Sequence, residues 1–302
     1  MENLKQTIAT YLPRSVKSAA LTQGAVRLAS RAANAAARSR AAATGYGYAR
    51  AWRQRFPTGD TAESGSIAES GATNPLSAFF EARSTGRGIV KWRHYFEIYD
   101  RHLAKFVGAS PRLLEIGIYA GGSLDMWREY LGPNAELYGV DIDPYCMRFE
   151  EAKVFIGDQA DRAFWQRFRA ETPLLDIVID DGGHTVEQQL VTLEEVLPRL
   201  RPGGVYICED IHGDDNAFLG YVHGLARGLF GYDLTLDEGN PERVLSSPTT
   251  PFQSAMHSVH VYPYVVVIER RSLQLDELVA SQRGTEWPPA SPVNKRGEPP
   301  PG

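Results

Sequence analysis

Apolar and polar positions form alternating blocks after residue 111, and these blocks predict strands and helices in turn. Strands are expected at residues 112–118, 135–143, 153–157, 176–179 and 205–208. The last two are short apolar runs without alternation, typical of strands buried on both faces. Between them, apolar residues recur at helical spacing at residues 124–130, 161–171 and 186–200. This order predicts an α/β fold with a doubly wound, mostly parallel Rossmann-like sheet.

Further segments extend this core in both directions along the chain. Helices are expected at residues 78–81, 92–106 and 214–230, and a short strand at 232–237. Residues 256–271 first alternate and then become wholly apolar, which predicts a closing hairpin. Ser123 and Asp161 are expected to cap the helices that begin beside them.

Charge divides the chain into an arm and a body. Residues 1–56 hold ten Lys and Arg against one acid, a net charge of +9, which leaves 22 basic and 36 acidic residues, or −14, in residues 57–302. The composition predicts a basic helical arm over 1–56, a flexible linker over 57–74, a folded domain over 75–283 and a disordered tail over 284–302.

The arm has only a weak apolar face. It could contact a membrane surface or an anionic partner, or it could be a solvated or subunit-packing helix of a homo-oligomer; its composition also resembles a transit peptide. No apolar run approaches the ~20 residues of a membrane span. Two cysteines make no disulfide framework, so a cytoplasmic location is expected. The acidic body disfavours nucleic acid as a partner.

Acidic residues follow two neighbouring strands of the predicted sheet. Asp180 and Asp181 close the run at 176–179, and Glu209 and Asp210 close the run at 205–208. The carboxyl ends of neighbouring parallel strands face one crevice, where clustered carboxylates repel unless a cation lies between them. Oxygen ligands of this kind suit Mg²⁺ or Mn²⁺, so a divalent metal is expected here.

A glycine-containing turn joins the first strand to its helix. It carries Tyr119, Gly121 and Ser123, and its backbone N–H groups would face a ligand. Tyr119 takes the place of the second glycine of the dinucleotide fingerprint G-x-G-x-x-G, and Glu115 precedes Gly117 by two residues. An acid at that position suits a cationic or amine-bearing ligand, so S-adenosylmethionine fits better than NAD.

Two more positions are candidates for cofactor binding. Asp141, about twenty residues beyond the turn, could accept hydrogen bonds from both ribose hydroxyls, or it could be a helix cap before Pro144. Asp158 and Gln159 leave the third strand where an adenine edge would be read. The segment 86–96, which crowds Lys91 among basic and aromatic residues, could form a substrate lid or a polar helix start.

Five motifs together carry a family resemblance, in the order E-I-G-I-Y-A-G-G-S, V-D-I-D, G-D-Q, I-D-D-G-G-H and C-E-D. They resemble the class I S-adenosylmethionine-dependent methyltransferases and, more narrowly, the metal-dependent sugar O-methyltransferases of macrolide biosynthesis, of the mycinamicin 2''-O-methyltransferase type. The resemblance covers about residues 86–271. The short basic arm departs from the sizeable auxiliary domain of those enzymes, which leaves the acceptor open.

The resemblance implies roles for particular residues. Asp181, Glu209 and Asp210 would bind the metal, and His184 would be the general base, although it could also be a plain helix-start residue. The expected cofactor-binding residues are Glu115, Gly117, Tyr119, Gly121, Ser123, Asp141, Asp158, Gln159 and Asp180. Asp180 could instead support the site from behind its ligands.

The expected activity is Mg²⁺-dependent O-methylation, by S-adenosylmethionine, of a sugar hydroxyl in a glycosylated natural product or glycolipid. A sugar hydroxyl is too weak an acid to react unaided, so a metal and a histidine base are chemically consistent with this acceptor. Two alternatives stay open: a metal-dependent catechol or phenol O-methyltransferase, and a non-catalytic S-adenosylmethionine-binding partner protein.

Overall fold

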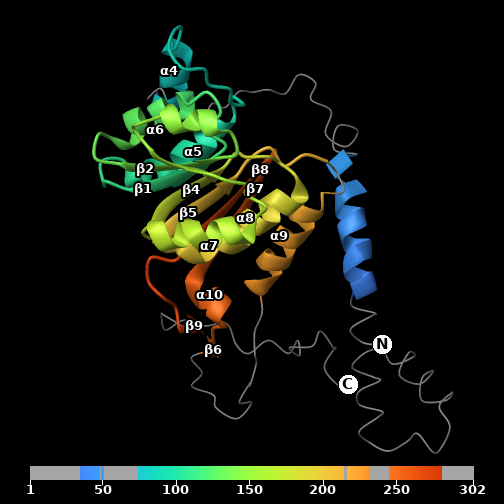
Figure 1. The fold of residues 1–302 in the computed structure, drawn as a ribbon. Coiled ribbons are helices and arrows are strands. Elements are labelled where there is room, and N and C mark those ends of the chain that lie inside the picture. The colour runs from blue at the N-terminus through green and yellow to red at the C-terminus, as the bar shows by residue number, and fades with distance from the viewer. Residues whose placement is uncertain (1–34, 48, 51–73, 214–215, 231–244, 281–302) are drawn as a thin grey trace, which may run out of the picture. The chain divides into compact units, whose positions relative to one another are not determined.

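The computed structural model describes residues 35–47, 49–50, 74–213, 216–230 and 245–280 (Figure 1). The chain divides into two compact units, Met1–Ala72 and Thr73–Gly302. In the first unit, residues 35–47 and 49–50 are helical and exposed. Most of the predicted arm and linker, the strand at 232–237 and the tail at 284–302 lie outside the described residues. Among the helices that are described, none is long and apolar enough to cross a membrane.

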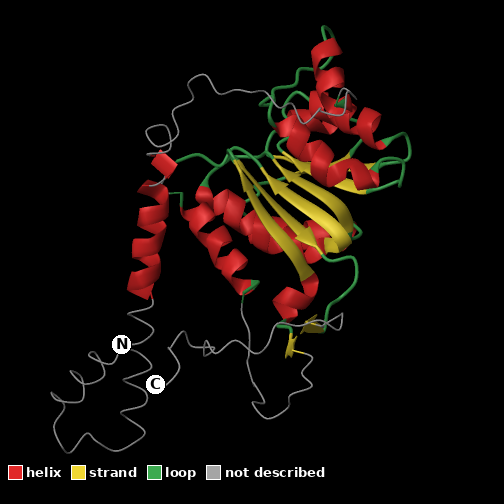
Figure 2. Ribbon diagram, turned by 180° about the vertical axis from the view of Figure 1, so that it is seen from behind, coloured by secondary structure: helices red, strands yellow, loops and turns green. Residues whose placement is uncertain are grey.

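The second unit is built on a seven-stranded sheet with the order β3-β2-β1-β4-β5-β8-β7 (Figure 2). Its strands are β1 (Arg112–Ile116), β2 (Glu136–Asp141), β3 (Lys153–Ile156), β4 (Leu175–Asp180), β5 (Leu200–Cys208), β7 (Met256–Tyr262) and β8 (Val265–Arg270). The first five are parallel, and β8 and β7 add an antiparallel hairpin. β6 (Leu245–Pro248) and β9 (Glu277–Ala280) form a separate two-stranded sheet. The predicted sheet and closing hairpin are confirmed.

Helices cover both faces of the sheet (Figure 1). One face packs against α4 (Pro75–Ala82), α5 (Tyr95–Leu103) and α6 (Gly122–Leu131), and the other against α7 (Arg162–Glu171), α8 (Val186–Val196) and α9 (Ala217–Gly228). Short elements complete the unit: η2 (Ala104–Phe106), η3 (Pro144–Arg148), η4 (Leu197–Arg199) and α10 (Pro251–Ala255). Within β4, Ile177 and Ile179 face the first set of helices and Val178 the second. Burial on both faces explains the uninterrupted apolar runs.

Helix ends follow local signals, with corrections to three predictions. Asp161 caps α7 as predicted, accepting a hydrogen bond from the Ala163 backbone. The predicted helix at 186–200 ends earlier, at Val196, because Pro198 follows in η4 and cannot continue an α-helix. The helix predicted from residue 92 begins only at Tyr95. The prediction that Ser123 caps α6 is wrong: Gly121 occupies that position, with φ +82°.

Gly117 lets two functional loops touch. It follows β1 with φ +86°, and a Cβ placed on it would lie 2.0 Å from the carbonyl oxygen of Asp181. The Asp181 backbone N–H in turn donates to the carbonyl of Ile116 over 3.0 Å. Only glycine combines this backbone conformation with such close contact.

We expect Gly117→Ala to destabilise the fold more than the control Gly108→Ala. Gly108 also has a positive φ, +72°, but a Cβ added to it would meet no other atom within 4 Å. The left-handed conformation costs an alanine roughly 1–2 kcal/mol at either position. The collision at Gly117 adds about 1–3 kcal/mol of overpacking. Urea unfolding of both variants measures the difference; equal midpoints would show that the Gly117–Asp181 contact is not tight.

Candidate functional site

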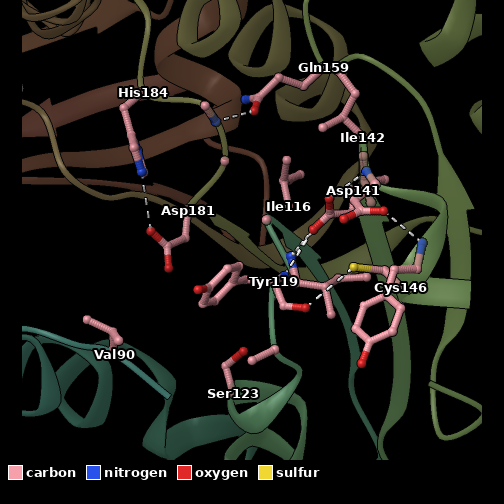
Figure 3. Close-up of a pocket in the computed structure, with 18 of the residues that line it drawn as sticks. Val90, Ile116, Tyr119, Ser123, Asp141, Ile142, Cys146, Gln159, Asp181 and His184 are labelled. Atoms are coloured by element: carbon pink, nitrogen blue, oxygen red, sulfur yellow. Dashed lines mark hydrogen bonds and ion pairs between the residues drawn. The ribbon is translucent and has the colours of Figure 1, made fainter. Parts of the chain in front are cut away.

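A cavity of about 810 Å³ opens at the carboxyl ends of the parallel strands (Figure 3). Its walls come from the loops after β1, β2, β3 and β4, with Asp210 after β5 and residues 88–91 before α5. This edge is where open α/β sheets bind ligands, because the loops there diverge and leave a crevice.

Asp141, at the end of β2, organises the loop between β1 and α6. Its Oδ2 accepts hydrogen bonds from the Ile118 and Tyr119 backbones over 2.9 and 3.0 Å, and its Oδ1 accepts one from the Asp143 backbone over 2.9 Å. A carboxylate oxygen accepts about two hydrogen bonds, so Oδ2 is fully used and Oδ1 can accept one more. Asp141 therefore shapes the loop and can still accept a hydrogen bond at Oδ1 from a hydroxyl in the cavity.

Glu115 lies beneath this loop, and its side chain is absent from the cavity wall as the structure describes it. Its carboxylate accepts hydrogen bonds from Ser123 Oγ over 2.8 Å and from Trp127 Nε1 over 3.2 Å. Burial raises the pKa of Glu115 to about 7. The structure thus differs from the expected direct cofactor contact: this acid ties β1 to the start of α6.

Asp180 supports the loop after β4 from behind. Its Oδ2 accepts a hydrogen bond from Tyr206 over 2.9 Å and its Oδ1 one from Gln159 Nε2 over 3.0 Å, while burial raises its pKa to about 7. Gln159 Oε1 in turn accepts a hydrogen bond from the Gly183 backbone over 2.7 Å. Asp180 therefore positions the loop that carries Asp181 and His184, rather than lining the cavity.

Lys91 inserts its ammonium group into the acidic cluster. Its Nζ lies 2.5 Å from Asp181 Oδ2 and 2.8 Å from Glu209 Oε2, and its side chain is only 2% exposed. Burial alone would lower the pKa of Lys91, but the carboxylates of Glu209 and Asp181 outweigh burial and raise it. Burial raises the pKa of Glu209, against the opposing attraction of Lys91.

Two tyrosines of α5 and one tryptophan donate hydrogen bonds to Glu209 and Asp210, the two acids that follow β5. Tyr99 donates to Glu209 Oε1 over 2.6 Å. Tyr95 and Trp92 donate to Asp210 Oδ1 over 2.6 and 3.0 Å. Glu209 is thereby turned away from the cavity, toward Lys91 and Tyr99, whereas Asp210 lies on the cavity wall.

His184 points toward Asp181 (Figure 3). Its Nε2 lies 4.0 Å from Asp181 Oδ1 and 3.9 Å from Asp210 Oδ2, and the three side chains could hold one metal ion. Mg²⁺ commonly binds through one or two carboxylates and completes its shell with water or substrate oxygens. The two inward carboxylate oxygens fit that pattern, so the donor set suits a divalent cation.

Backbone strain collects around the cavity. Tyr119, His184 and Asp210 on the cavity wall have positive φ, between 50° and 59°, and among the described non-glycine residues only Ser110 and Tyr264, which lies in the β7–β8 turn, share this. This conformation is costly for these side chains and persists only where the surrounding structure enforces it. Such strain is typical of functional sites.

The cavity collects most of the residues that the sequence singled out. On its wall lie Gly117, Tyr119, Ser123, Asp141, Asp158, Gln159, Asp181, His184 and Asp210. Behind or beside it, within the described residues, lie Glu115, Gly121, Asp180 and Glu209. Sequence reasoning missed the roles of Lys91, Trp92, Tyr95 and Tyr99. Their crowding in one short segment was the available signal, but it did not reveal their acidic partners.

We expect Lys91→Met to destabilise the protein by about 3–5 kcal/mol, because it leaves Asp181 and Glu209 without their buried counter-charge. Arg93→Met is the control, since Arg93 forms an exposed pair with Glu81 that contributes at most about 1 kcal/mol. Thermal melting measures both. A Lys91→Met variant as stable as Arg93→Met would mean that the carboxylates do not depend on the ammonium.

Comparisons with known proteins agree with this architecture. Residues 114–211 match the family model of a methyltransferase domain. The chain is 28% identical over 207 residues to an 8-demethyl-8-alpha-L-rhamnosyl tetracenomycin-C 2'-O-methyltransferase of Streptomyces olivaceus, covering 61% of this chain and 53% of the relative. It is 34% identical over 132 residues to the mycinamicin VI 2''-O-methyltransferase of Micromonospora griseorubida, covering 41% and 32%.

A solved structure is similar as well. The MycE methyltransferase of the mycinamycin biosynthetic pathway, in complex with Mg and SAH, superimposes with a TM-score of 0.53 at 26% identity, covering 66% of this chain and 55% of that one. The chain thus spans about half or less of the length of these relatives. Its sheet is that of the class I methyltransferase fold, and the predicted resemblance to macrolide sugar O-methyltransferases is confirmed.

Proposed function

We propose that the protein transfers a methyl group from S-adenosylmethionine to a sugar hydroxyl of a glycosylated natural product or glycolipid, with the help of a bound divalent cation. The observation that carries the proposal is the convergence of Asp181, Asp210 and His184 on the wall of a cavity that has a nucleotide-type loop beside it. The names of both curated relatives describe methylation of a hydroxyl, in one case on a rhamnosyl group.

The cofactor would occupy the part of the cavity formed after β1, β2 and β3. Asp141 Oδ1 would accept a hydrogen bond from a ribose hydroxyl, and Asp158 and Gln159 would lie near the base. The similar MycE structure contains SAH, the demethylated form of this donor, which supports the assignment.

The acidic cluster has the charge that a divalent cation requires. With all groups ionised, Asp181, Glu209 and Asp210 carry three negative charges and Lys91 returns one, so a single divalent cation would balance the remainder. Asp181 and Asp210 would hold the ion through the oxygens that face His184. A bound cation would lower the pKa of an acceptor hydroxyl and orient it.

His184 would take the proton from the acceptor hydroxyl. Its imidazole is 37% exposed, it belongs to the cavity wall, and the loop that carries it is fixed by Gln159 and Asp180. A neutral imidazole within reach of the hydroxyl is a suitable general base near neutral pH.

Aromatic rings lie beside the metal-binding side of the cavity. Tyr264 lies 5.5 Å from Trp92 and 4.6 Å from His212, measured between ring centroids. Trp92 and Tyr264 are 49% and 43% exposed. Such partly exposed rings could hold the flat C–H face of a sugar or an aromatic acceptor, so a phenol remains the second candidate.

We expect Asp141→Ala to weaken binding of S-adenosylhomocysteine roughly 10- to 100-fold, because the variant loses charge-assisted hydrogen bonds and loosens the loop. Calorimetric titration measures the affinity. Glu136→Ala, at the other end of β2, is the control and should bind normally. Undiminished binding by Asp141→Ala would remove Asp141 from the cofactor site.

Turnover with glycosylated and phenolic acceptors tests the rest of the proposal. We expect methylation of a sugar hydroxyl that EDTA abolishes, and a loss of about 10²- to 10⁴-fold in kcat for His184→Ala. A phenol ionises more readily, so the same variant should affect it only mildly. His223→Ala, an exposed histidine of α9, is the control. Full activity in EDTA would contradict the role of the cation.

A further inference from the structure

A second group of metal-ligating side chains lies apart from the cavity. His102 at the end of α5, His260 on β7 and Glu269 on β8 have ligand atoms that all lie within 4.8 Å of one another. Glu269 lies opposite Val205 in β5, three residues before Cys208, where that strand ends beside the candidate site. Three residues of a strand span about 10 Å, so the group is separate from the acidic cluster.

Glu269 is the centre of this group. His102 Nδ1 lies 3.0 Å from its Oε1, while His257 Nδ1 and His260 Nε2 lie 3.7 and 3.9 Å from its Oε2. The last two distances are too long for hydrogen bonds. In a tetrahedral zinc site, ligand atoms 2.0–2.1 Å from the metal lie about 3.4 Å from one another. The two distances are close to this ligand-to-ligand spacing.

A β-bulge brings His257 to this side of the hairpin. Met256 pairs with Arg270 and Ser258 with Glu269, which leaves His257 as the extra residue of β7. Regular alternation would point His257 away from Ser258, yet its Nδ1 lies 3.1 Å from Ser258 Oγ. Bulges commonly re-aim a side chain at a functional position, and this one brings a third imidazole to within 3.7 Å of Glu269, beside the group of His102, His260 and Glu269.

The surroundings suit ligation by His102 in particular. This side chain is 4% exposed, and its Nε2 lies 2.9 Å from the Tyr262 hydroxyl. Metal-binding histidines usually hold their second ring nitrogen in such a hydrogen bond, which orients the ligating nitrogen. Lys105 also lies 3.6 Å from Glu269, but it is 47% exposed and free to turn into solvent.

We propose that His102, His257, His260 and Glu269 form a structural zinc site that ties α5 to the β7–β8 hairpin. A donor set of three imidazoles and one carboxylate favours zinc over magnesium, because imidazole nitrogens suit zinc and magnesium requires oxygen ligands. Binding requires Ser258 to release both His260 Nε2 and His257 Nδ1, which lie 2.9 and 3.1 Å from its hydroxyl. The site would close a long loop between α5 and the final hairpin, and its ligands lie outside the cavity wall.

Equilibrium dialysis of the full chain against Zn²⁺ in excess Mg²⁺, followed by metal analysis, tests the proposal. The wild type and His184→Ala should retain one tightly bound zinc ion, since His184 belongs to the other site. His257→Ala and His260→Ala should lose it. His223→Ala, an exposed histidine outside both groups, is the matched control and should retain it.

Thermal melting provides the second readout. Zinc should raise the Tm of the wild type and of His223→Ala and leave that of His260→Ala unchanged. His257 is 58% exposed, so His257→Ala should fold even if His260→Ala does not. Zinc that is retained by both His257→Ala and His260→Ala, or lost from His184→Ala alone, would overturn the proposal.

Discussion

The candidate site depends on one buried ammonium group. Lys91 joins three parts of the chain that are far apart in sequence: the segment before α5, the loop after β4 and the end of β5. Burying these charges costs several kcal/mol per ion, which only close pairing and further hydrogen bonds recover. Tyr99 supplies such a bond to Glu209. The pairing fixes which carboxylate oxygens remain directed toward the cavity.

The consequence is a division of roles between neighbouring acids. Asp180 and Glu209 lie buried and hold the structure, whereas Asp181 and Asp210, the next residue in each case, reach the cavity. Successive side chains leave a strand on opposite sides, so one acid of each pair points inward and the other outward. The buried acids, Asp180 and Glu209, fix the loops. The acids that reach the cavity face His184, whose backbone is held in a strained conformation.

The core strands, their mostly parallel sheet and the edge that carries the site could be predicted from the sequence, because buried parallel strands produce short apolar runs and their carboxyl ends share one crevice. The position of Lys91 could not, because its partners lie 90 and 118 residues further along the chain. For a related reason, the sequence led us to expect that Glu115 contacts the cofactor. Its carboxylate instead accepts hydrogen bonds from Ser123 and Trp127, eight and twelve residues away, inside the protein. Local pattern does not show which partner satisfies a buried charge.

One face of α5 connects the two groups of polar side chains. Tyr95, Tyr99 and His102 follow one another at spacings of four and three residues, so they share a face of the helix. The two tyrosines donate to Asp210 and Glu209, and burial raises the pKa of both hydroxyls, so they remain protonated donors near neutral pH. His102 anchors the same face to β8 through Glu269. A shift of α5 along its axis would therefore disturb the acidic cluster and the histidine group together.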